Sequence, residues 1–563
     1  MLSFNAGAMQ VCYEKGFLRY IKTEGNEILR MIYFALRDEN WGTLSTRIDK
    51  EEIHTEADAF NVHYEAINFS KQQDVFRWNC SIKGEKSGKI TFEISGEALV
   101  DIKKNRAGFC ILHPVKESIN QPVEILHRDN STTKSIFPEH IAPDDPFKMI
   151  KAMRWVVKGR WYGLHFEGDL FETEDQRNWT DASFKTFCTP LDKPFPVLLK
   201  EGDQVYQKVL FSPEAAPSKV PKRNKIEIKI SNDKIPFPAL GLQDNRTPVN
   251  DKVINLIQKL GLSHLRVDIN LSNADWQTDL SKAVERAIDY NIPVELAVSV
   301  SGNFKDELES FIQVCVDKKY PIKQINVYSA THLTTAQETI DFIVQLKSRI
   351  PKVKFGAGTD FNFTELNRNR FNRSSLDFVT YSIDPQEHAT DDQTIIENAA
   401  AQFDTVVSAK AIYPGSNVHV SPIALKRRFN PYATNNENKV CSEEQRRDAR
   451  QATTFNALWT LGSIKYLAEG GAGSLTYFQT VGPLGIISDD GVPFPVYKSF
   501  ELFSEVTALL KCTSSEPLKV DGICDDGGHL IVWNYTNEGQ QVYIENTSQD
   551  IALSPQEIKI ISI

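Results

Sequence analysis

Apolar and polar residues alternate along the chain with two different periods. Residues 1–210 contain short segments rich in Val, Ile, Phe, Tyr and Trp, many of which alternate apolar and polar side chains. These segments span residues 29–37, 60–70, 75–84, 88–99, 107–114 and 154–168. Such alternation is typical of strands with one buried face, and no clear helical pattern interrupts the series. We therefore expect an N-terminal antiparallel β-sandwich domain over residues 1–210.

A proline-rich segment follows this region. Pro213, Pro217 and Pro221 all lie within residues 211–224. Prolines at this spacing favour an extended, semi-rigid chain. The segment is therefore expected to be a linker that marks the first domain boundary.

From residue 225 the period changes, and apolar runs of strand length alternate with helical patterns. The eight runs span residues 237–243, 264–270, 293–301, 322–330, 352–360, 376–383, 417–425 and 472–480. Eight strands with intervening helices are the number needed for a closed barrel, whereas an open doubly wound sheet does not need the eighth. We predict a (β/α)8 TIM barrel over residues 225–510, followed by a small C-terminal β-domain over residues 511–563.

Local signals place the first helix of the barrel. Thr247 is a suitable N-cap residue, and Pro248 after it suits the first turn. Gly261 is expected to end the helix.

Composition narrows the class of protein. The 563 residues carry a formal net charge of −10, which gives no electrostatic footprint for nucleic acid or an anionic membrane. The N-terminus lacks the basic and apolar parts of a signal peptide, and no run of about eighteen apolar residues occurs. The eight cysteines are scattered without C-x-x-C spacing, as expected of reduced thiols. We expect a cytoplasmic protein with neither nucleic acid nor membrane as partner, and no particular oligomeric state is indicated.

Motifs for bound groups are also missing. The glycines form no phosphate-binding loop or dinucleotide fingerprint, so no nucleotide cofactor is expected. His332, His388, Asp268 and Asp360 are candidate metal ligands, but no H-x-H or H-E-x-x-H spacing supports them. A metal-free site without cofactors is the prediction, and a metal site is the lesser alternative.

One stretch, residues 164–190, concentrates polar chemistry. Six acids occur within fifteen positions, and they are Glu167, Asp169, Glu172, Glu174, Asp175 and Asp181. One interpretation is an acidic surface hairpin covering aromatic residues. The other is a ligand surface, in which Trp179 offers an apolar platform for a sugar while Glu174, Asp175, Asn178 and Lys185 bind hydroxyls. We expect this stretch to belong to the sandwich domain, to fold over the barrel mouth and to supply part of the pocket.

Barrel enzymes carry their chemistry at the C-terminal ends of the strands, so polar residues there form the candidate list. In strand order these residues are Arg266, Asp268, His332, Asp360, Glu365, Tyr381, Asp384, His388, Lys426, Arg427 and Arg428. About half are expected to be structural because alternate strand residues point away from the mouth. Arg266 and Asp268 are two residues apart and are either ligand-binding residues or an internal ion pair.

Two reaction classes fit this rim. A glycosidase needs two carboxyl groups about 5–10 Å apart. The glutamates that many barrel glycosidases carry after strands four and seven are missing here. An inverting pair chosen from Asp360, Glu365 and Asp384 is still possible. Histidines near the rim suit ester or lactone hydrolysis near neutral pH. For lactone hydrolysis we expect Asp360 and His388 to carry the proton transfers, with Glu365 as the alternative base. His332 or Arg427 would lie near the leaving oxygen or the oxyanion.

Several blocks together resemble the D-apionate lactonase family. They span residues 108–114, 167–191, 358–368, 384–389, 420–434 and 459–471, and the long acidic block is the most specific. The resemblance implies hydrolysis of D-apionolactone to D-apionate in bacterial apiose catabolism, without a redox cofactor. It also implies the domain order predicted above. At Asp384 and Glu387 the family pattern leads us to expect an asparagine and an apolar residue, which leaves a related lactone open as the substrate. A TIM-barrel glycoside hydrolase acting on an apiose-containing or related glycan is the alternative, ahead of a non-catalytic carbohydrate-binding protein.

Overall fold

The structure is a computed structural model that describes residues 1–70, 73–214, 225–373, 375–433 and 439–563. The chain forms two compact units, which are taken in turn. The first comprises Met1–Gln176 and Ala182–Lys222, and the second comprises Arg177–Asp181 and Arg223–Ile563. Residues 215–224 of the expected linker lie outside the described residues.

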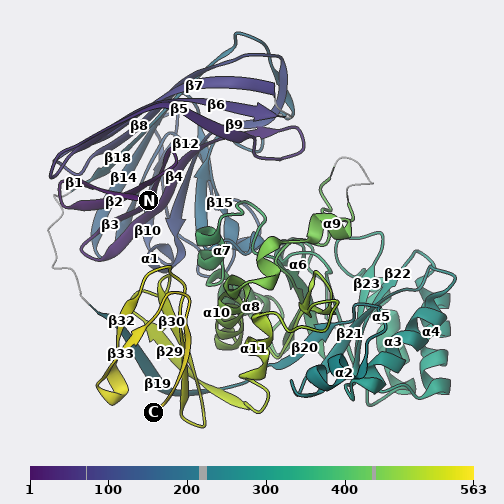
Figure 1. Ribbon diagram of the computed structural model, residues 1–563. Helices are drawn as coiled ribbons and strands as arrows, with labels where there is room; N and C mark the ends of the chain where they lie inside the picture. Colours follow the sequence, from purple (N-terminus) through teal and green to yellow (C-terminus); the bar gives the residue numbers. More distant parts are fainter. Residues whose placement is uncertain (71–72, 215–224, 374, 434–438) are drawn as a thin grey trace. The chain divides into compact units, whose positions relative to one another are not determined.

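The first unit consists of two antiparallel sheets of nine strands each (Figure 1). One sheet contains β1 (Leu2–Ala6), β2 (Met9–Glu14), β3 (Phe17–Thr23), β4 (Asn26–Asp38), β9 (Ile102–Pro114), β12 (Phe147–Ile150), β15 (Phe171–Asp175), β16 (Ser183–Phe187) and β17 (Val197–Leu199). The other contains β5 (Ser45–Thr55), β6 (Phe60–Ser70), β7 (Gln73–Gly84), β8 (Ile90–Ala98), β10 (Pro122–Leu126), β11 (Thr132–Ile136), β13 (Ala152–Val157), β14 (Arg160–Glu167) and β18 (Gln204–Pro213). A single helical turn, α1 (Val115–Ser118), follows β9.

The alternating pattern explains how these two sheets pack. In β6 the buried residues Val62, Tyr64 and Ala66 alternate with more exposed ones. Their neighbours in one continuous core come from both sheets, and Phe92 of β8 meets Phe109 of β9 with ring centroids 4.9 Å apart. The predicted β-sandwich is therefore confirmed, because the period-two apolar faces are the faces that the sheets bury against each other.

The second unit is built around a closed parallel barrel. Its strands are β20 (Ala239–Gln243), β21 (His264–Asn270), β22 (Val294–Val300), β23 (Ile322–Ser329), β24 (Lys354–Gly358), β25 (Phe378–Ile383), β26 (Asn417–Ile423) and β27 (Ser474–Val481). Each strand pairs in parallel with the next, β20 also pairs with β27, and the short β28 (Gly485–Ile487) extends from β27. All eight expected strands are present, and the predicted barrel is confirmed.

Helices connect the barrel strands. They are α2 (Asp251–Gln258), α3 (Trp276–Asp289), α4 (Phe304–Lys318), α5 (Gln337–Leu346), α6 (Phe363–Arg368), α7 (Asp392–Asn398), α8 (Ala401–Ile412), α9 (Glu443–Arg446), α10 (Thr454–Gly470) and α11 (Val496–Glu501). Helices α3, α4 and α5 lie along the outside of β21 to β23 (Figure 1). No helix within the described part of the chain has the length and apolar character needed to cross a membrane.

The predicted cap of α2 was wrong. Asn250, not Thr247, is the N-cap residue, and its side chain accepts a hydrogen bond of 3.1 Å from the Val253 backbone N–H. The hydroxyl of Thr247 instead donates to the Asn245 carbonyl oxygen. Asparagine is at least as good a cap as threonine, so the helix begins three residues later than expected.

A seven-stranded sheet completes the second unit. It contains β19 (Ile226–Pro236), β29 (Ala508–Ser514), β30 (Val520–Asp525), β31 (His529–Asn534), β32 (Gln540–Ile544), β33 (Gln549–Leu553) and β34 (Ile558–Ser562). Strand β19 precedes the barrel in sequence but pairs with β29 and β32, so the segment placed at the start of the barrel belongs to this sheet. The reason is that its alternating residues Ile226, Ile228 and Ile230 bury in the core of the C-terminal sheet.

Candidate active site

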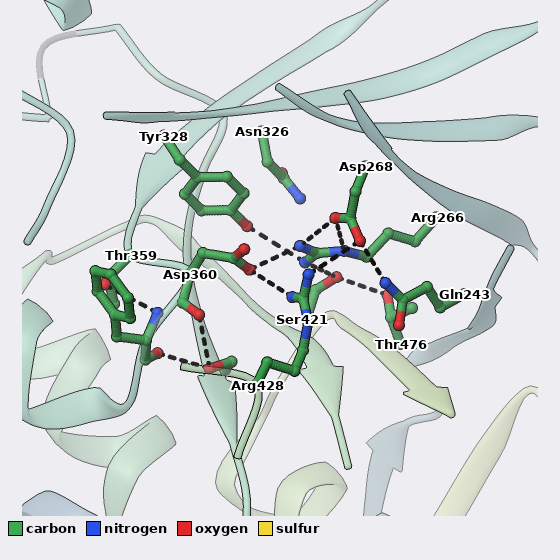
Figure 2. Close-up of polar contacts among 12 residues, drawn as sticks. Gln243, Arg266, Asp268, Asn326, Tyr328, Thr359, Asp360, Ser421, Arg428 and Thr476 are labelled. Carbon is green, nitrogen blue, oxygen red and sulfur yellow. Dashed lines mark hydrogen bonds and ion pairs between the residues drawn. The ribbon is translucent and has the colours of Figure 1, made fainter. Parts of the chain in front are cut away.

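Arg266 is the centre of a buried polar cluster at the mouth of the barrel (Figure 2). It lies on β21 and donates to Asp268 Oδ1 from Nη2 at 2.7 Å and from Nε at 3.0 Å. The same Nη2 donates to Asp360 Oδ1 at 2.7 Å, and Nη1 donates to Ser421 Oγ at 3.0 Å. Burial alone would lower the pKa of Arg266, but Asp268 and Asp360 hold it well above its usual value. The guanidinium is therefore a permanent buried charge within the barrel.

Arg428, which follows β26, joins the same two carboxylates (Figure 2). Its Nη1 donates to Asp360 Oδ1 at 2.9 Å and its Nη2 to Asp268 Oδ2 at 3.0 Å. Burial of Asp268 favours its neutral form, yet Arg266 and Arg428 hold the pKa of this carboxyl below its usual range. Two arginines and two aspartates thus form a closed set of ion pairs.

The backbone around β24 explains how Asp360 reaches this cluster. Gly358 ends the strand with a φ of 158°, and a Cβ atom there would lie 1.9 Å from the carbonyl oxygen of Thr380. Only glycine fits such a close approach. The Thr359 N–H then donates to the same Thr380 oxygen at 3.0 Å, which fixes the turn that carries Asp360 to the barrel mouth.

An acidic cavity opens beside this cluster, at the ends of β24, β25 and β26. It encloses about 340 Å³ of space and is open to solvent. The residues around it are Trp179, Asp360, Phe361, Asn362, Glu365, Ser382, Asp384, Glu387, Arg427, Arg428, Phe429, Asn430, Pro431 and Tyr432. Four carboxylic acids and two arginines therefore border one space, and all of them belong to the second unit.

Glu365 is the least satisfied acid of the acidic cavity. It lies on α6, its side chain is fully buried, and neither carboxyl oxygen makes a hydrogen bond of ordinary geometry within the described ranges. Burial raises the pKa of Glu365 to about 7, and the nearby Tyr432 hydroxyl only partly opposes this shift. A carboxyl with a pKa near neutrality exchanges protons readily at physiological pH.

Asp384 and Glu387 form a second pair of acids in the same cavity. Glu387 accepts a hydrogen bond from Asn362 Nδ2 at 2.7 Å and pairs with Arg427 Nη1 at 3.2 Å. Burial, and next the charge of Glu387, raise the pKa of Asp384 well above its usual value. Glu387 accepts from a cationic and a side-chain amide donor, whereas Asp384 accepts from the Gln386 backbone N–H at 3.2 Å, and we assign the negative charge to Glu387 and the proton to Asp384.

The segment Arg177–Asp181 belongs to the barrel unit although its neighbours on both sides belong to the first unit. Its polar side chains bond to barrel residues, as Arg177 to Asp404 at 3.2 Å, Asn178 to Asn367 at 2.9 Å, and Asp181 to His388 at 2.5 Å and to Asn398 at 2.9 Å. These side-chain contacts hold the segment on the barrel.

These contacts present Trp179 to the acidic cavity. Trp179 ends the 3-10 helix Gln176–Trp179, and its ring meets Tyr432 edge-on with centroids 5.8 Å apart. The His388 ring packs against its other side at 6.1 Å. His388 does not border the cavity itself, so its contact with Asp181 and Trp179 gives it a place in the wall.

The structure thus brings part of the expected site together. Asp360, Glu365, Trp179 and Arg427 border one cavity, and Arg266 and Asp268 adjoin it through Asp360 and Arg428. The roles assigned to these residues from the sequence stay predictions.

Two other expected residues lie elsewhere in the barrel unit. His332 is exposed, and its Nδ1 contacts the hydroxyls of Ser329 and Thr331 at 3.1 and 3.0 Å. The Tyr381 hydroxyl is buried in the barrel wall and shares a hydrogen bond of 2.8 Å with Thr405. Neither residue borders the acidic cavity.

The remaining expected residues belong to the first unit. Glu174 of β15 forms an ion pair of 2.7 Å with Lys185 of β16, and Asp175 accepts a hydrogen bond from the Ala142 N–H at 3.0 Å. All three side chains are buried, so the stretch is not the solvated hairpin of the first interpretation. A role for them in binding a ligand stays a prediction.

The pairing partners expected for Arg427 and Arg428 also differ. Arg427 and Arg428 could have paired with the acids of residues 167–185, but in the barrel unit Arg427 pairs with Glu387, and Arg428 pairs with Asp360 and Asp268. Sequence reasoning did not select Glu387, Tyr432 or Asn362 as site residues. The available signal was their position, since each lies in the segment that follows the C-terminal end of a barrel strand.

The cysteines and the candidate metal ligands were also compared with the structure. All eight cysteines are free. Within the described ranges, no three His, Cys, Asp or Glu side chains lie close enough together to hold a metal ion, including those of His332, His388, Asp268 and Asp360.

Comparisons with known proteins agree with this architecture. The family model of the D-apionate lactonase N-terminal domain matches residues 1–216, and that of the D-apionate lactonase TIM barrel domain matches residues 238–511. A curated relative, the D-apionate lactonase of Brucella anthropi, is 25% identical over 98% of this chain and 95% of its own length.

Solved structures give a weaker similarity. CelM2, a bifunctional glucanase-xylanase from a metagenome library, has a TM-score of 0.42 and 9% identity over 60% of this chain and 99% of its own. A β-arabinopyranosidase has a TM-score of 0.34 and 9% identity over 99% of both chains. These scores support no inference about function. The two family models, in contrast, cover most of the chain in the order sandwich then barrel, and the chain belongs to the D-apionate lactonase family.

Proposed function

We propose that this protein hydrolyses a sugar lactone, with D-apionolactone as the substrate and D-apionate as the product. Family membership supports the reaction class, and the name of the Brucella anthropi relative supports the substrate. The observation that carries the proposal is the buried carboxyl of Glu365 in the acidic cavity. A base with a pKa of about 7 is what activation of water needs near neutral pH.

Glu365 is a better general base than Asp360 in this cavity. Oδ1 of Asp360 already accepts hydrogen bonds from Arg266 and Arg428, so its charge is neutralised by two permanent cations. Within the described residues no arginine hydrogen-bonds the carboxyl of Glu365, and the charge of Arg368 lowers its pKa less than burial raises it, so Glu365 is the more basic group. We infer that Glu365 takes the proton and that Asp360 orients Arg428.

The reaction then follows from the charges around the cavity. Glu365 removes a proton from water as the oxygen attacks the lactone carbonyl carbon, and the carbonyl oxygen gains a negative charge. Arg427 and Arg428 border the cavity and are the donors suited to that oxyanion. Collapse of the adduct breaks the bond to the ring oxygen, which receives the proton from Glu365 to form the free hydroxyl. The new carboxylic acid ionises on release.

The other residues of the cavity suit a small polyhydroxylated ring. Trp179 offers an apolar face for C–H groups, and Tyr432 borders the same space. The Asp384 and Glu387 pair supplies a donor and an acceptor for hydroxyl groups. Because these polar groups are already fixed by Asn362 and Arg427, the cavity is ordered before a ligand enters.

A panel of substrates tests the proposed function. The pure protein is incubated with five-membered aldonolactones, including D-apionolactone, and with aryl glycosides, while proton release and aryl alcohol release are followed in parallel. We expect turnover of the lactones, fastest for D-apionolactone, and no change when a chelator is added. Turnover of the aryl glycosides alone would assign the protein to the glycosidase alternative, for which Glu365, Asp384 and Asp360 are the available acids. Loss of turnover with chelator and recovery with zinc would contradict the metal-free mechanism.

A further inference from the structure

A second cavity lies on the other side of Arg428. It encloses about 370 Å³ at the ends of β20, β26 and β27 and is open to solvent. Arg428 borders both cavities. The second cavity, called the basic cavity below, is also lined by Lys426 and Arg446, and no carboxyl side chain lines it among the residues that the structure describes.

Arg446 is the unusual residue of the basic cavity. It ends the short helix α9 and forms no ion pair with a described carboxylate, and its Nε has no hydrogen-bond partner in the described part of the chain. Burial, and next the positive charge of Arg428, lower the pKa of its guanidinium. The charges of Glu443 and Asp268 oppose this shift only in part, so a bound anion would further stabilise the charged guanidinium.

The neighbouring residue gives the contrast. Arg447 is exposed and pairs with Glu443 at 2.6 Å and with Glu444 at 3.4 Å. The short helix therefore provides ion-pair partners for Arg447, whereas Glu443 acts on Arg446 only electrostatically and offsets its lowered pKa in part. The charge of Arg446 is left available to a ligand.

The rest of the lining indicates the kind of anion. Ile423, Leu425, Phe478 and Leu484 provide apolar surface, and Gln479 provides an amide. An inorganic anion makes no favourable contact with apolar side chains, whereas a short carbon chain with a carboxylate at one end contacts both the apolar and the cationic residues of this lining. Arginine also binds a carboxylate through two parallel N–H donors.

We propose that the basic cavity is a binding site for the carboxylate of a sugar acid, the product class of the proposed reaction. The choice of ligand rests on the proposed function, in which a neutral lactone becomes an anion. In the acidic cavity Arg427 and Arg428 are already paired with Glu387 and Asp360, whereas no described carboxyl lines the basic cavity, which therefore favours that anion more. Arg428 is shared by the two cavities, so the product carboxylate has a cationic site directly beside the place where it is made.

Titration calorimetry on the full chain tests this site. The probes are sodium D-apionate, inorganic phosphate and neutral D-apiose, and the proteins are the wild type, Arg446→Gln, Arg446→Lys and the matched control Arg447→Gln. We expect D-apionate to bind the wild type more tightly than phosphate or D-apiose. Loss of one charge-assisted contact is expected to raise its Kd by about tenfold or more in Arg446→Gln. Arg446→Lys keeps the charge and should lose less, and Arg447→Gln should change the Kd by less than about twofold.

The outcomes separate this site from the reaction. Equal D-apionate affinity in Arg446→Gln and Arg447→Gln, with both variants folded by their melting temperatures, would overturn the proposal. Phosphate binding tighter than D-apionate would overturn the assignment to a sugar acid. Glu365→Gln should bind D-apionate as the wild type does, and this measurement needs no turnover. A protein that binds D-apionate through Arg446 but hydrolyses no lactone would refute the proposed function and leave the site standing.

Discussion

The acidic cavity and the basic cavity share Arg428 but differ in the other charged residues that line them. The acidic cavity has four carboxylic acids and Arg427, and the basic cavity has Lys426, Arg446 and no carboxyl within the described ranges. Both arise from the ends of neighbouring strands in one barrel, so the fold does not determine the difference. The loops after β24 and β25 supply the acids, and the loop after β26 supplies most of the cations. One scaffold thus offers separate environments for a neutral and for an anionic ligand.

A second contrast lies inside the acidic cavity. Asp360 and Glu365 both border it, but Asp360 is paired with two arginines while Glu365 is buried without a hydrogen-bond partner of ordinary geometry in the described residues. The chemical type of the side chain is nearly the same. The surroundings decide which carboxyl is a fixed charge and which one exchanges a proton.

The largest effect is expected for Glu365→Gln. Removal of a general base lowers kcat by about 10²–10⁴-fold, and glutamine keeps the shape of the side chain. Stopped-flow measurement of proton release from D-apionolactone gives kcat, with the exposed Glu443→Gln as matched control. If folded Glu365→Gln keeps a near-normal kcat, the base is another residue. Asp360→Asn and His388→Ala, which remove the pair expected from the sequence, would then identify it.

The same residue should make stability depend on pH. Its pKa is raised from 4.5 to about 7 in the folded protein, so the folded state binds more protons than the unfolded state between these values. The free energy of unfolding therefore falls as pH rises from about 4.5 to about 7, by roughly 3 kcal/mol for this group. Denaturant unfolding at pH 5 and pH 8 should show a smaller difference in Glu365→Gln than in the wild type. Arg446→Gln should keep the wild-type difference because arginine stays charged throughout. If the free energy of unfolding differs equally between pH 5 and pH 8 in Glu365→Gln and in the wild type, folding does not raise the pKa of Glu365.

Turnover should rise with pH over the range in which the free energy of unfolding falls. A general base must be ionised, so kcat should fall about tenfold for each pH unit below about 7 and level off above it. Measurement of kcat from pH 5 to pH 8.5 checks this limb, and the residual activity of Glu365→Gln should lack it. A wild-type kcat that is flat down to pH 5 would show that Glu365 is not the group whose ionisation limits turnover.

Much of the fold followed from the sequence because periodicity is a local signal. The eight barrel strands lie where their apolar runs placed them, from β20 to β27. Strand β19 lies in the segment assigned to the barrel but pairs with the C-terminal sheet, because the alternation of Ile226, Ile228 and Ile230 indicates a strand but not its partner. Pairing partners are chosen by tertiary contacts far along the chain.

In the site too, contacts between residues close in sequence could be considered from the sequence, whereas contacts between distant residues could not. Arg266 and Asp268 are two residues apart on one strand, and an internal ion pair was one of the two alternatives that this spacing left open. The meeting of Arg428 with Asp360 was not foreseen, since they are 68 positions apart in sequence. The high pKa of Glu365 depends on its burial in the folded protein, and a list of polar residues at strand ends contains no such information.

The smallest effect is expected at Trp179, and it sharpens the comparison of the two cavities. Trp179 borders only the acidic cavity, where its ring offers an apolar face to a sugar. Trp179→Ala should raise KM for D-apionolactone by about tenfold, since a sugar loses one aromatic contact, and should change kcat less. The Kd of D-apionate at the basic cavity should stay within about twofold of the wild type. Trp161→Ala is the matched control, because this half-buried tryptophan on β14 stacks with Arg154, 4.7 Å from its ring centroid, in the first unit. If Trp179→Ala lowers the melting temperature but leaves KM unchanged, Trp179 only anchors the Arg177–Asp181 segment to the barrel. An equal rise of the lactone KM and the D-apionate Kd would mean that the two cavities are one site.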